Sequence, residues 1–166
     1  SAKRNAETYG VTEHIDFFLS DGVRNLPRDF DTLVCAGMGG DTMVSILSAA
    51  PWLQGGGYRL ILQCQSKTPT LRRYLSENGW AICEETVLRD GRFLYTVMEV
   101  LWQPEAPRLT VGQRYFPPAL RKHPTPETAA YYHWVADGLR LAVRHRPDDQ
   151  NRQALKELEA LEEAMK

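Results

Sequence analysis

The sequence predicts an α/β fold with a mostly parallel sheet, followed by a smaller α-helical part. Over residues 1–103, apolar runs of strand length alternate with amphipathic runs of helix length, the pattern of strands joined by crossover helices. Two further apolar runs flank Asp90-Gly91, a turn pair that predicts an antiparallel hairpin. Residues 104–166 hold a proline-rich connector and then apolar residues at helical spacing. We therefore expect two domains, 1–103 and 104–166.

The elements of the first part follow from apolar pattern and turn residues. Gly10 is a natural stop for a first helix, Pro51 ends a second, and Thr68 with Pro69 begins a third. The expected order is a helix over 2–9, a strand over 14–18, a strand over 32–36, a helix over 41–50, a strand over 60–63, a helix over 68–78 and a hairpin over 80–102. The connection over 21–31 is short for a crossover, so it is either very tight or joins strands that are not neighbours.

The second part is predicted to form an antiparallel helical hairpin. Thr125, Pro126 and Glu127 carry the signature of a helix start, and a break at 147–149 separates that helix from another. The apolar spacing is typical of a coiled-coil seam. The seam residues are Tyr132, Val135, Leu139 and Ala142 in the first helix and Leu155, Leu158, Leu161 and Met165 in the second.

Charge is uneven here although the whole chain has a net charge of −1. Residues 103–147 hold seven Lys and Arg against three acids, a difference of +4, whereas residues 148–166 hold three against six, a difference of −3. Bulk charge therefore neither indicates nor excludes a local RNA-binding face. The candidate phosphate contacts are Arg72, Arg73, Arg121 and Lys122, with a solvated surface as the competing interpretation.

Composition is that of a globular protein, with 166 residues of which 43% are hydrophobic. Cys35, Cys64 and Cys83 lie in separate strand-like runs, so we expect reduced thiols rather than disulfides or a metal site. No apolar run approaches the roughly 20 residues that span a bilayer, and no signal peptide is visible, so the cytoplasm is the expected location. The chain lacks an initial Met and opens like the end of a helix, and we expect it to be a fragment.

The stretch CAGMGGD, residues 35–41, carries the strongest functional signal. It lacks the Lys of a phosphate-binding loop, and Thr42 stands where a dinucleotide fingerprint needs its third glycine. Three glycines between a strand and a helix would let a flat ligand approach the backbone at the carboxyl end of the sheet. The competing interpretation is a tight turn, which needs one glycine of positive φ.

Other polar positions are weaker signals. Asp21 could accept a hydrogen bond from an adenine amino group, or simply form a turn before Gly22. Gln63 and Gln65 end a strand at the same edge, where satisfying the backbone is their expected role. Hydrolase motifs are absent, and the four histidines are scattered.

Several stretches, in order, resemble the bacterial tRNA (adenine-N1)-methyltransferases that act on adenine 22 of tRNA. They are SAKRNAETYGVTEHIDFFLSDG, DTLVCAGMGGDTMVSIL, RLILQCQSKTPTLRRYLSENGW, RFLYTVMEV and, nearer the C-terminus, RYFPPAL. The resemblance implies a Rossmann-like methyltransferase with S-adenosylmethionine (SAM) as cofactor and tRNA as partner. It also implies a C-terminal coiled-coil domain that helps to hold tRNA.

The resemblance places Asp21 and Gly22 at the adenine of SAM. The residues that would line the cofactor and the target base are Ala36, Gly37, Met38, Gly39 and Gly40. The basic residues that would face tRNA are Arg72, Arg121, Lys122, Arg140 and Arg144. The catalytic residue is unknown, since no residue of this chain matches one.

The chain departs from the family at its start. In the family, a first strand with a G-S-D-H-type loop holds the methionine end of SAM, and a second strand ends in an acid that binds the ribose. Both are missing here, so the resemblance implies an incomplete class I methyltransferase sheet. The missing strands belong between those at 14–18 and 32–36, which accounts for the short connection. We expect this chain alone to bind SAM poorly and to be inactive.

The expected function of the parent protein is methyl transfer from SAM to N1 of an adenine in tRNA. One alternative is a methyltransferase of the same fold that acts on another RNA or on a small molecule. Another is a non-catalytic RNA-binding module, for which the basic connector and the helical hairpin would suffice.

Overall fold

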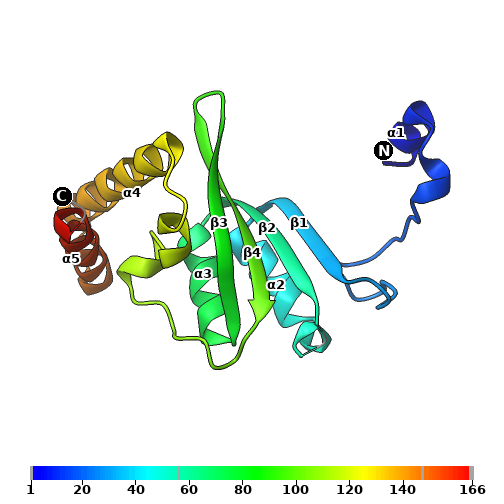
Figure 1. The fold of residues 1–166 in the computed structure, drawn as a ribbon, viewed down its shortest axis with the longest axis horizontal. Helices are drawn as coiled ribbons and strands as arrows, with labels where there is room; N and C mark the ends of the chain where they lie inside the picture. The colour runs from blue at the N-terminus through cyan, green and yellow to red at the C-terminus, as the bar shows by residue number, and fades with distance from the viewer. Residues whose placement is uncertain (1, 56, 147, 165–166) are drawn as a thin grey trace. The chain divides into compact units, whose positions relative to one another are not determined.

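A computed structural model describes residues 2–55, 57–146 and 148–164. The chain divides into two compact units, Ser1–Phe30 and Asp31–Lys166, and each is described by itself (Figure 1). The expected domain boundary after residue 103 falls inside the second unit, so the connector and the C-terminal helices pack together with the sheet.

The first unit consists of one helix and irregular chain. α1 (Ala2–Tyr9) ends at Gly10, whose φ of +66° confirms the expected glycine stop. A 3-10 turn follows at Thr12–His14. The predicted strand over 14–18 is wrong, because no described residue before Thr32 belongs to a strand. A strand is stabilised by hydrogen bonds to a neighbouring strand, which an apolar pattern by itself does not supply.

The second unit is built on a four-stranded sheet of order β1-β2-β4-β3. Its strands are β1 (Thr32–Gly39), β2 (Arg59–Ser66), β3 (Trp80–Asp90) and β4 (Phe93–Trp102). β1 and β2 are parallel, whereas β4 pairs antiparallel with both β2 and β3. The sheet is therefore mixed and not mostly parallel. The hairpin is confirmed, but its two-residue loop is Gly91-Arg92, one position later than expected.

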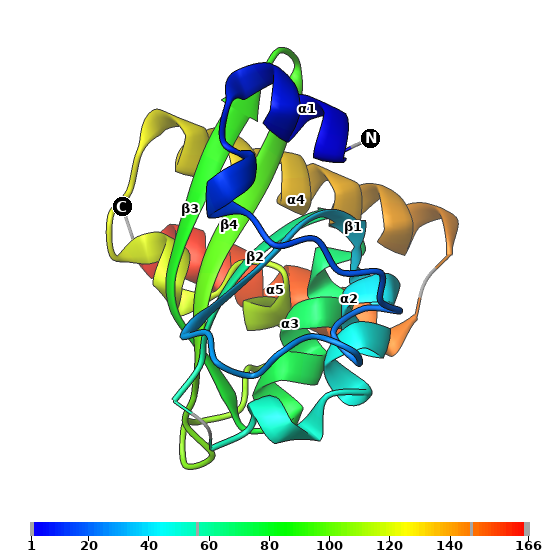
Figure 2. The ribbon, with the colours of Figure 1, turned by 90° about the vertical axis from the view of Figure 1, so that its right-hand side faces the viewer.

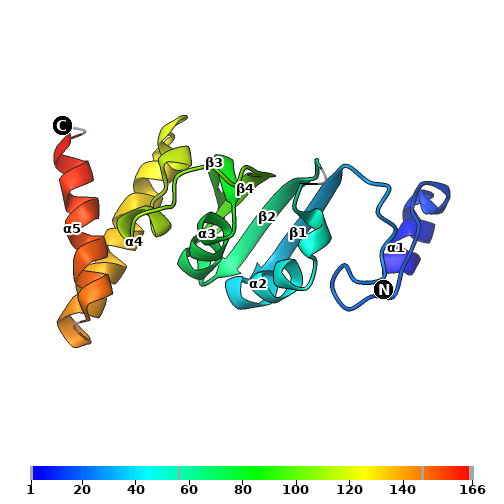
Figure 3. The same ribbon diagram turned by 90° about the horizontal axis from the view of Figure 1, so that it is seen from below.

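Two helices cover one face of this sheet (Figure 3). α2 (Gly40–Ser48) follows β1 directly, and α3 (Thr68–Glu77) connects β2 to β3. Both helices were expected, although Thr68 is the first helical residue and the capping position falls on Lys67. The buried apolar side chains of these elements include Leu33, Cys35, Met43, Leu47, Leu60, Leu62, Leu71, Leu75, Met98 and Val100.

A connector with two 3-10 turns, Gly112–Arg114 and Pro118–Arg121, leads to two helices, α4 (Pro126–His145) and α5 (Asp149–Ala164). The predicted start of α4 is confirmed, because Thr125 caps it and exchanges two hydrogen bonds with Thr128. Figure 2 shows α4 passing behind the hairpin; α4 contacts β3, whereas α5 contacts α4 and the Gly112–Arg114 turn.

α4 and α5 contact each other through a second apolar core. The hydroxyl of Tyr132 donates a 2.9 Å hydrogen bond to the carbonyl of Leu158, which joins the two helices. The predicted seam residue Met165 lies outside the described residues, as does Pro147 of the predicted break. The residues of this core are Val87, Phe116, Leu120, Tyr131, Tyr132, Val135, Ala136, Leu139, Ala154 and Leu158.

A buried ion pair connects the two cores. Nη2 of Arg72, in α3, lies 2.5 Å from Oε1 of Glu85 in β3, and neither side chain is accessible to solvent. The other end of the guanidinium donates hydrogen bonds of 3.0 Å and 2.8 Å to the carbonyls of Arg114 and Tyr115 in the connector. Nη2 also donates a 3.3 Å bond to the hydroxyl of Tyr131 in α4. A single side chain therefore joins four separate segments.

Removing one partner of this pair is expected to be costly, because the other charge stays buried. Glu85→Gln should lower the free energy of unfolding by about 3–5 kcal/mol. Arg72→Met combined with Glu85→Leu should cost less than the sum of the two single changes, because neither charge remains. Denaturant unfolding of the complete protein and of its variants measures the free-energy cost of the single changes and of the double change.

The control is the more exposed ion pair between Arg59 and Glu99, whose charged atoms lie 3.2 Å apart. Glu99→Gln should cost no more than about 1 kcal/mol. If Glu85→Gln costs no more than this control, the buried pair does not hold the unit together.

Candidate functional site

The turn between β1 and α2 contains the glycine-rich stretch. Gly37 has a φ of +78°, in the left-handed region that favours glycine. It is left out of the ladder with β2, where the register shifts between Ala36 and Met38. Its N–H donates a 2.7 Å hydrogen bond to Oε1 of Gln63, the backbone role expected for that side chain. Ala36 and Gly37 are both exposed at the carboxyl end of β1.

The next two glycines are fixed by close packing against the segment after β2. A Cβ on Gly40 would lie 2.4 Å from the carbonyl oxygen of Lys67, closer than non-bonded atoms approach. A Cβ on Gly39 would lie 3.0 Å from the hydroxyl of Ser66, which belongs to a side chain that can rotate. Internal constraints therefore account for Gly37 and Gly40 and weakly constrain Gly39, so the number of glycines does not by itself indicate a ligand. The exposed backbone at Gly37 is the feature that remains available to one.

Lys67 faces this turn and has a strained backbone. Its φ of +56° is the only positive value among the described residues other than glycine. A left-handed conformation at such a residue costs about 1–3 kcal/mol and is concentrated at functional sites. The ammonium group of Lys67 pairs with the carboxylate of Asp41 in the first turn of α2. This ion pair therefore links the first turn of α2 to the segment that follows β2.

Asp21 and Gly22 lie in the first unit, so the structure does not place them against the glycine turn. Gly22 has a φ of +60°, and the backbone N–H of Arg24 bonds to the carbonyl of Asp21 at 3.4 Å. The exposed carboxylate of Asp21 lies 3.7 Å from the guanidinium of Arg24. Within their own unit these residues form a turn, as the competing interpretation held.

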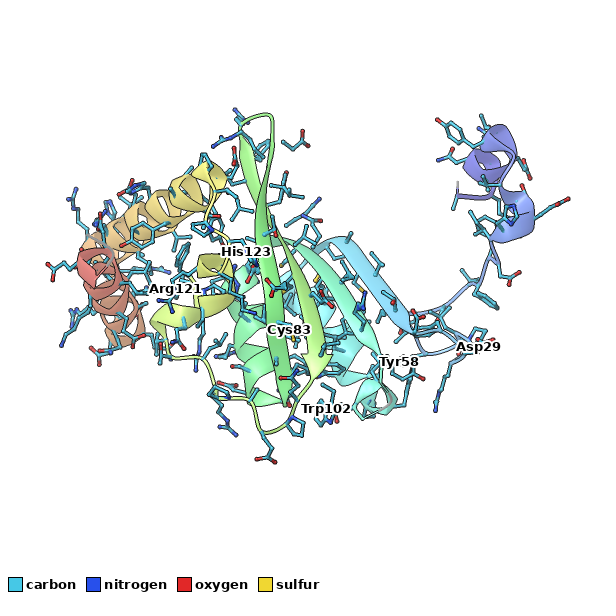
Figure 4. The ribbon with its side chains drawn as sticks, in the orientation of Figure 1. Asp29, Tyr58, Cys83, Trp102, Arg121 and His123 are labelled. Atoms are coloured by element: carbon cyan, nitrogen blue, oxygen red, sulfur yellow. The ribbon has the colours of Figure 1, made fainter. Side chains whose placement is uncertain are left out.

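The basic residues divide by their partners. The prediction that Arg72 contacts RNA is wrong, because its guanidinium is fully buried on Glu85. Lys122 is exposed but bonds to Glu84 at 2.9 Å, and Arg140 lies 3.0 Å from Asp137. Arg121 and Arg144 are exposed, and no ion pair of theirs is found among the described residues. Figure 4 shows Arg121 on the connector, close in sequence to His123.

A cavity of about 330 Å³ opens between the carboxyl end of β2 and α4. The segment after β2 forms one wall, β4 forms the floor, and α4 forms the opposite wall. Ser66 and Lys67 belong both to this cavity and to the packing against the glycine turn, so the two features adjoin. The residues of the cavity that the sequence did not single out include Leu94, Thr96, Tyr115, Tyr131, Trp134, Gly138 and Asn151.

The three cysteines are free thiols, as expected. Burial raises the pKa of Cys35, so the thiol beside the glycine turn is a packed apolar group and not a nucleophile. Among the described residues, no cluster of His, Cys, Asp or Glu is placed to hold a metal ion. No described helix is long and apolar enough to cross a membrane.

Comparisons with known proteins agree on one family. The model of the family described as tRNA (adenine(22)-N(1))-methyltransferase matches residues 1–166. The tRNA (adenine(22)-N(1))-methyltransferase of Bacillus subtilis is 32% identical over 99 residues, which are 59% of this chain and 42% of that protein. The chain spans less than half the length of the curated relatives that it matches.

Solved structures extend the similarity to the fold. A Streptococcus pneumoniae protein assigned as a tRNA (m1A22) methyltransferase, in complex with S-adenosyl-L-methionine, superposes with a TM-score of 0.78 at 27% identity, covering 95% of this chain and 74% of that one. The Bacillus subtilis m1A22 tRNA methyltransferase superposes with a TM-score of 0.72 at 26% identity, covering 98% and 73%.

Adding a methyl group at Gly40 should test the packing that closes the glycine turn. Gly40→Ala should lower the free energy of unfolding by about 1–3 kcal/mol, because the new Cβ meets the backbone of Lys67. Gly39→Ala should cost less, because the hydroxyl of Ser66 can move aside. Equal costs for the two variants, measured by urea unfolding of the complete protein, would contradict this account.

Proposed function

The chain belongs to the tRNA (adenine(22)-N(1))-methyltransferase family, and we propose that the protein of which it is part transfers a methyl group from SAM to N1 of adenine 22 in tRNA. The match of the family model over residues 1–166 carries this proposal. The position of the glycine turn supports it, because ligands of open α/β sheets bind beyond the carboxyl ends of the strands. We also propose the cytoplasm as its location, which membership of a tRNA-modifying family supports.

The residues present fit one side of a cofactor site. Ala36 and Gly37 are exposed and offer a surface on which no side chain larger than a methyl group stands, and Met38 borders it. We propose that these residues, with Gly39 and Gly40 behind them, line SAM and the target base, and that Asp21 and Gly22 contact the adenine of SAM. SAM, when bound, supplies the methyl group.

Methyl transfer to N1 of adenine mainly requires that the base and the methyl group be held in the right relative position. N1 of adenine has a usable lone pair, so holding the base in line with the methyl group supplies most of what is needed. A carboxylate would then take the amino proton as charge develops. Asp41 is the acid nearest the turn in sequence, but its carboxylate is engaged by Lys67 and lies in the first turn of α2, where the helix dipole accounts for it. No residue of this chain is therefore assigned as the base.

We also propose that two strands of the parent sheet are missing from this chain. β1 is an edge strand of the described sheet, and Val34 on it is 64% exposed, which is unusual for an apolar residue of a central strand. The missing strands would pair with β1 and supply the loop that holds the methionine end of SAM.

Residues 104–166 form a connector and a coiled-coil-like hairpin. We propose that this part holds tRNA through Arg121, Lys122, Arg140 and Arg144.

SAM binding is expected to need the missing strands. Isothermal titration of residues 1–166 alone should show no binding at micromolar SAM, whereas the complete protein should bind. The control is far-ultraviolet circular dichroism, which establishes that the isolated chain is folded. Micromolar affinity of the folded chain would contradict the half-site account and leave the assignment to the family intact.

Methylation by the complete protein should produce a primer-extension stop at adenine 22 of tRNA, because a methyl group on N1 blocks base pairing. A tRNA with guanine at that position is the control and should give no stop. Methylation of another RNA or of a small molecule would favour a different methyltransferase of this fold. Salt-dependent tRNA binding without methylation would favour a non-catalytic RNA-binding module.

A further inference from the structure

The cavity between β2 and α4 has features that packing within the chain does not explain. Its volume of about 330 Å³ is within the range of small-molecule sites. Lys67 is its only charged lining residue among the described ones, and the Lys67 ammonium is already paired with Asp41. The cavity therefore suits a neutral ligand with a polar edge better than a phosphate group.

A buried hydroxyl in this cavity lacks a partner. Thr96, in β4, is 2% exposed, and its Oγ1 makes no hydrogen bond with any described residue. Leaving a buried hydroxyl unpaired costs about 1–3 kcal/mol, and a valine of the same shape would avoid that cost. Thr96 lines the cavity, so a group bound there can supply the missing hydrogen bond.

A glycine in the middle of α4 opens the same cavity. Gly138 lies in the interior of a 20-residue helix, where glycine is less favourable than alanine by about 1 kcal/mol. A Cβ on Gly138 would meet no atom within 4 Å, so no neighbour excludes a side chain. The absent side chain keeps the cavity wide at this point.

The α4 wall of the cavity is aromatic. Trp134 is 64% exposed at the cavity, one helical turn before Gly138, and its ring lies 5.7 Å from that of Tyr131. An exposed indole beside an opening is a surface on which a flat ring can stack. Stacking on aromatic side chains is the common way in which proteins hold unpaired bases.

We propose that this cavity binds one nucleobase of the RNA substrate, unstacked from its neighbours, with the ring against Trp134 and its polar edge at the hydroxyl of Thr96. The inference rests on the proposed function, since it assumes an RNA substrate. Ser66 and Lys67 are shared with the glycine turn, so the bound base lies beside the site of methyl transfer. It is either the acceptor adenine or an adjacent base, and the two share the same chemistry.

Filling the cavity should reduce RNA binding without destabilising the protein. In the complete protein, Gly138→Leu should keep or raise the melting temperature and weaken tRNA binding by about tenfold, the scale of one lost base-stacking contact. Thr96→Val should keep or raise stability and also weaken binding. Ser48→Leu, which adds the same side chain at an exposed position of α2 outside the cavity, is the control and should bind tRNA like the wild type.

A fluorescent base identifies the occupant. We would place 2-aminopurine at position 22 or at either neighbouring position of the tRNA. At the position that enters the cavity, the wild-type protein should quench the fluorescence of 2-aminopurine, and Trp134→Ala should relieve this quenching. This readout needs no methyl transfer, so it separates failure of the cavity proposal from failure of the proposed function. Two results would overturn the proposal. One is that Gly138→Leu and Thr96→Val both bind tRNA like the wild type. The other is that quenching at none of the three labelled positions depends on Trp134.

Discussion

The ion pair between Arg72 and Glu85 is the interaction on which the second unit depends. Burial by itself would lower the pKa of Arg72, but the Glu85 carboxylate together with Tyr131 more than offsets this and the pKa lies above its usual value, so the charge is permanent. A permanent buried charge must keep its partners, because losing one leaves it unpaired in a medium of low dielectric. Those partners lie on β3, the connector and α4. The connector and α4 therefore cannot shift relative to the sheet without breaking the hydrogen bonds that they accept from Arg72.

This constraint explains why a cavity persists beside β2. Tyr131 bonds to Arg72 through its hydroxyl, stacks on Phe116 in the second core, and lines the cavity. Because these contacts hold α4 in place, the helix cannot move inward to fill the space that Gly138 leaves. On the other side, the strained backbone of Lys67 fixes the end of β2 against Gly40. Both walls are set by interactions outside the cavity, which is the preorganisation that a binding site needs.

Local pattern predicted most of the elements, and tertiary context decided the rest. The helices, the hairpin and the caps at Gly10 and Thr125 were predictable because each depends on neighbouring residues. The strand over 14–18 was not, because strand formation depends on a distant partner. Arg72 looked like a surface cation, since no signal in sequence shows that Glu85 lies across from it. The glycine turn was recognised, whereas the buried position of Thr96 depends on tertiary packing that no local pattern of the sequence shows.

Partners also change how the basic charge of the C-terminal part should be counted. Of the seven cations in residues 103–147, Arg114, Lys122 and Arg140 have carboxylate partners among the described residues. Exposed pairs of this kind contribute little to stability. A phosphate can therefore replace the carboxylate that pairs with Lys122 or Arg140 at a small cost in free energy. Arg72 has no such freedom, because its partner is buried with it. The chain thus separates two uses of positive charge: Arg72 holds the interior together, and under the proposed function the exposed cations would attract RNA toward a cavity whose lining is nearly neutral.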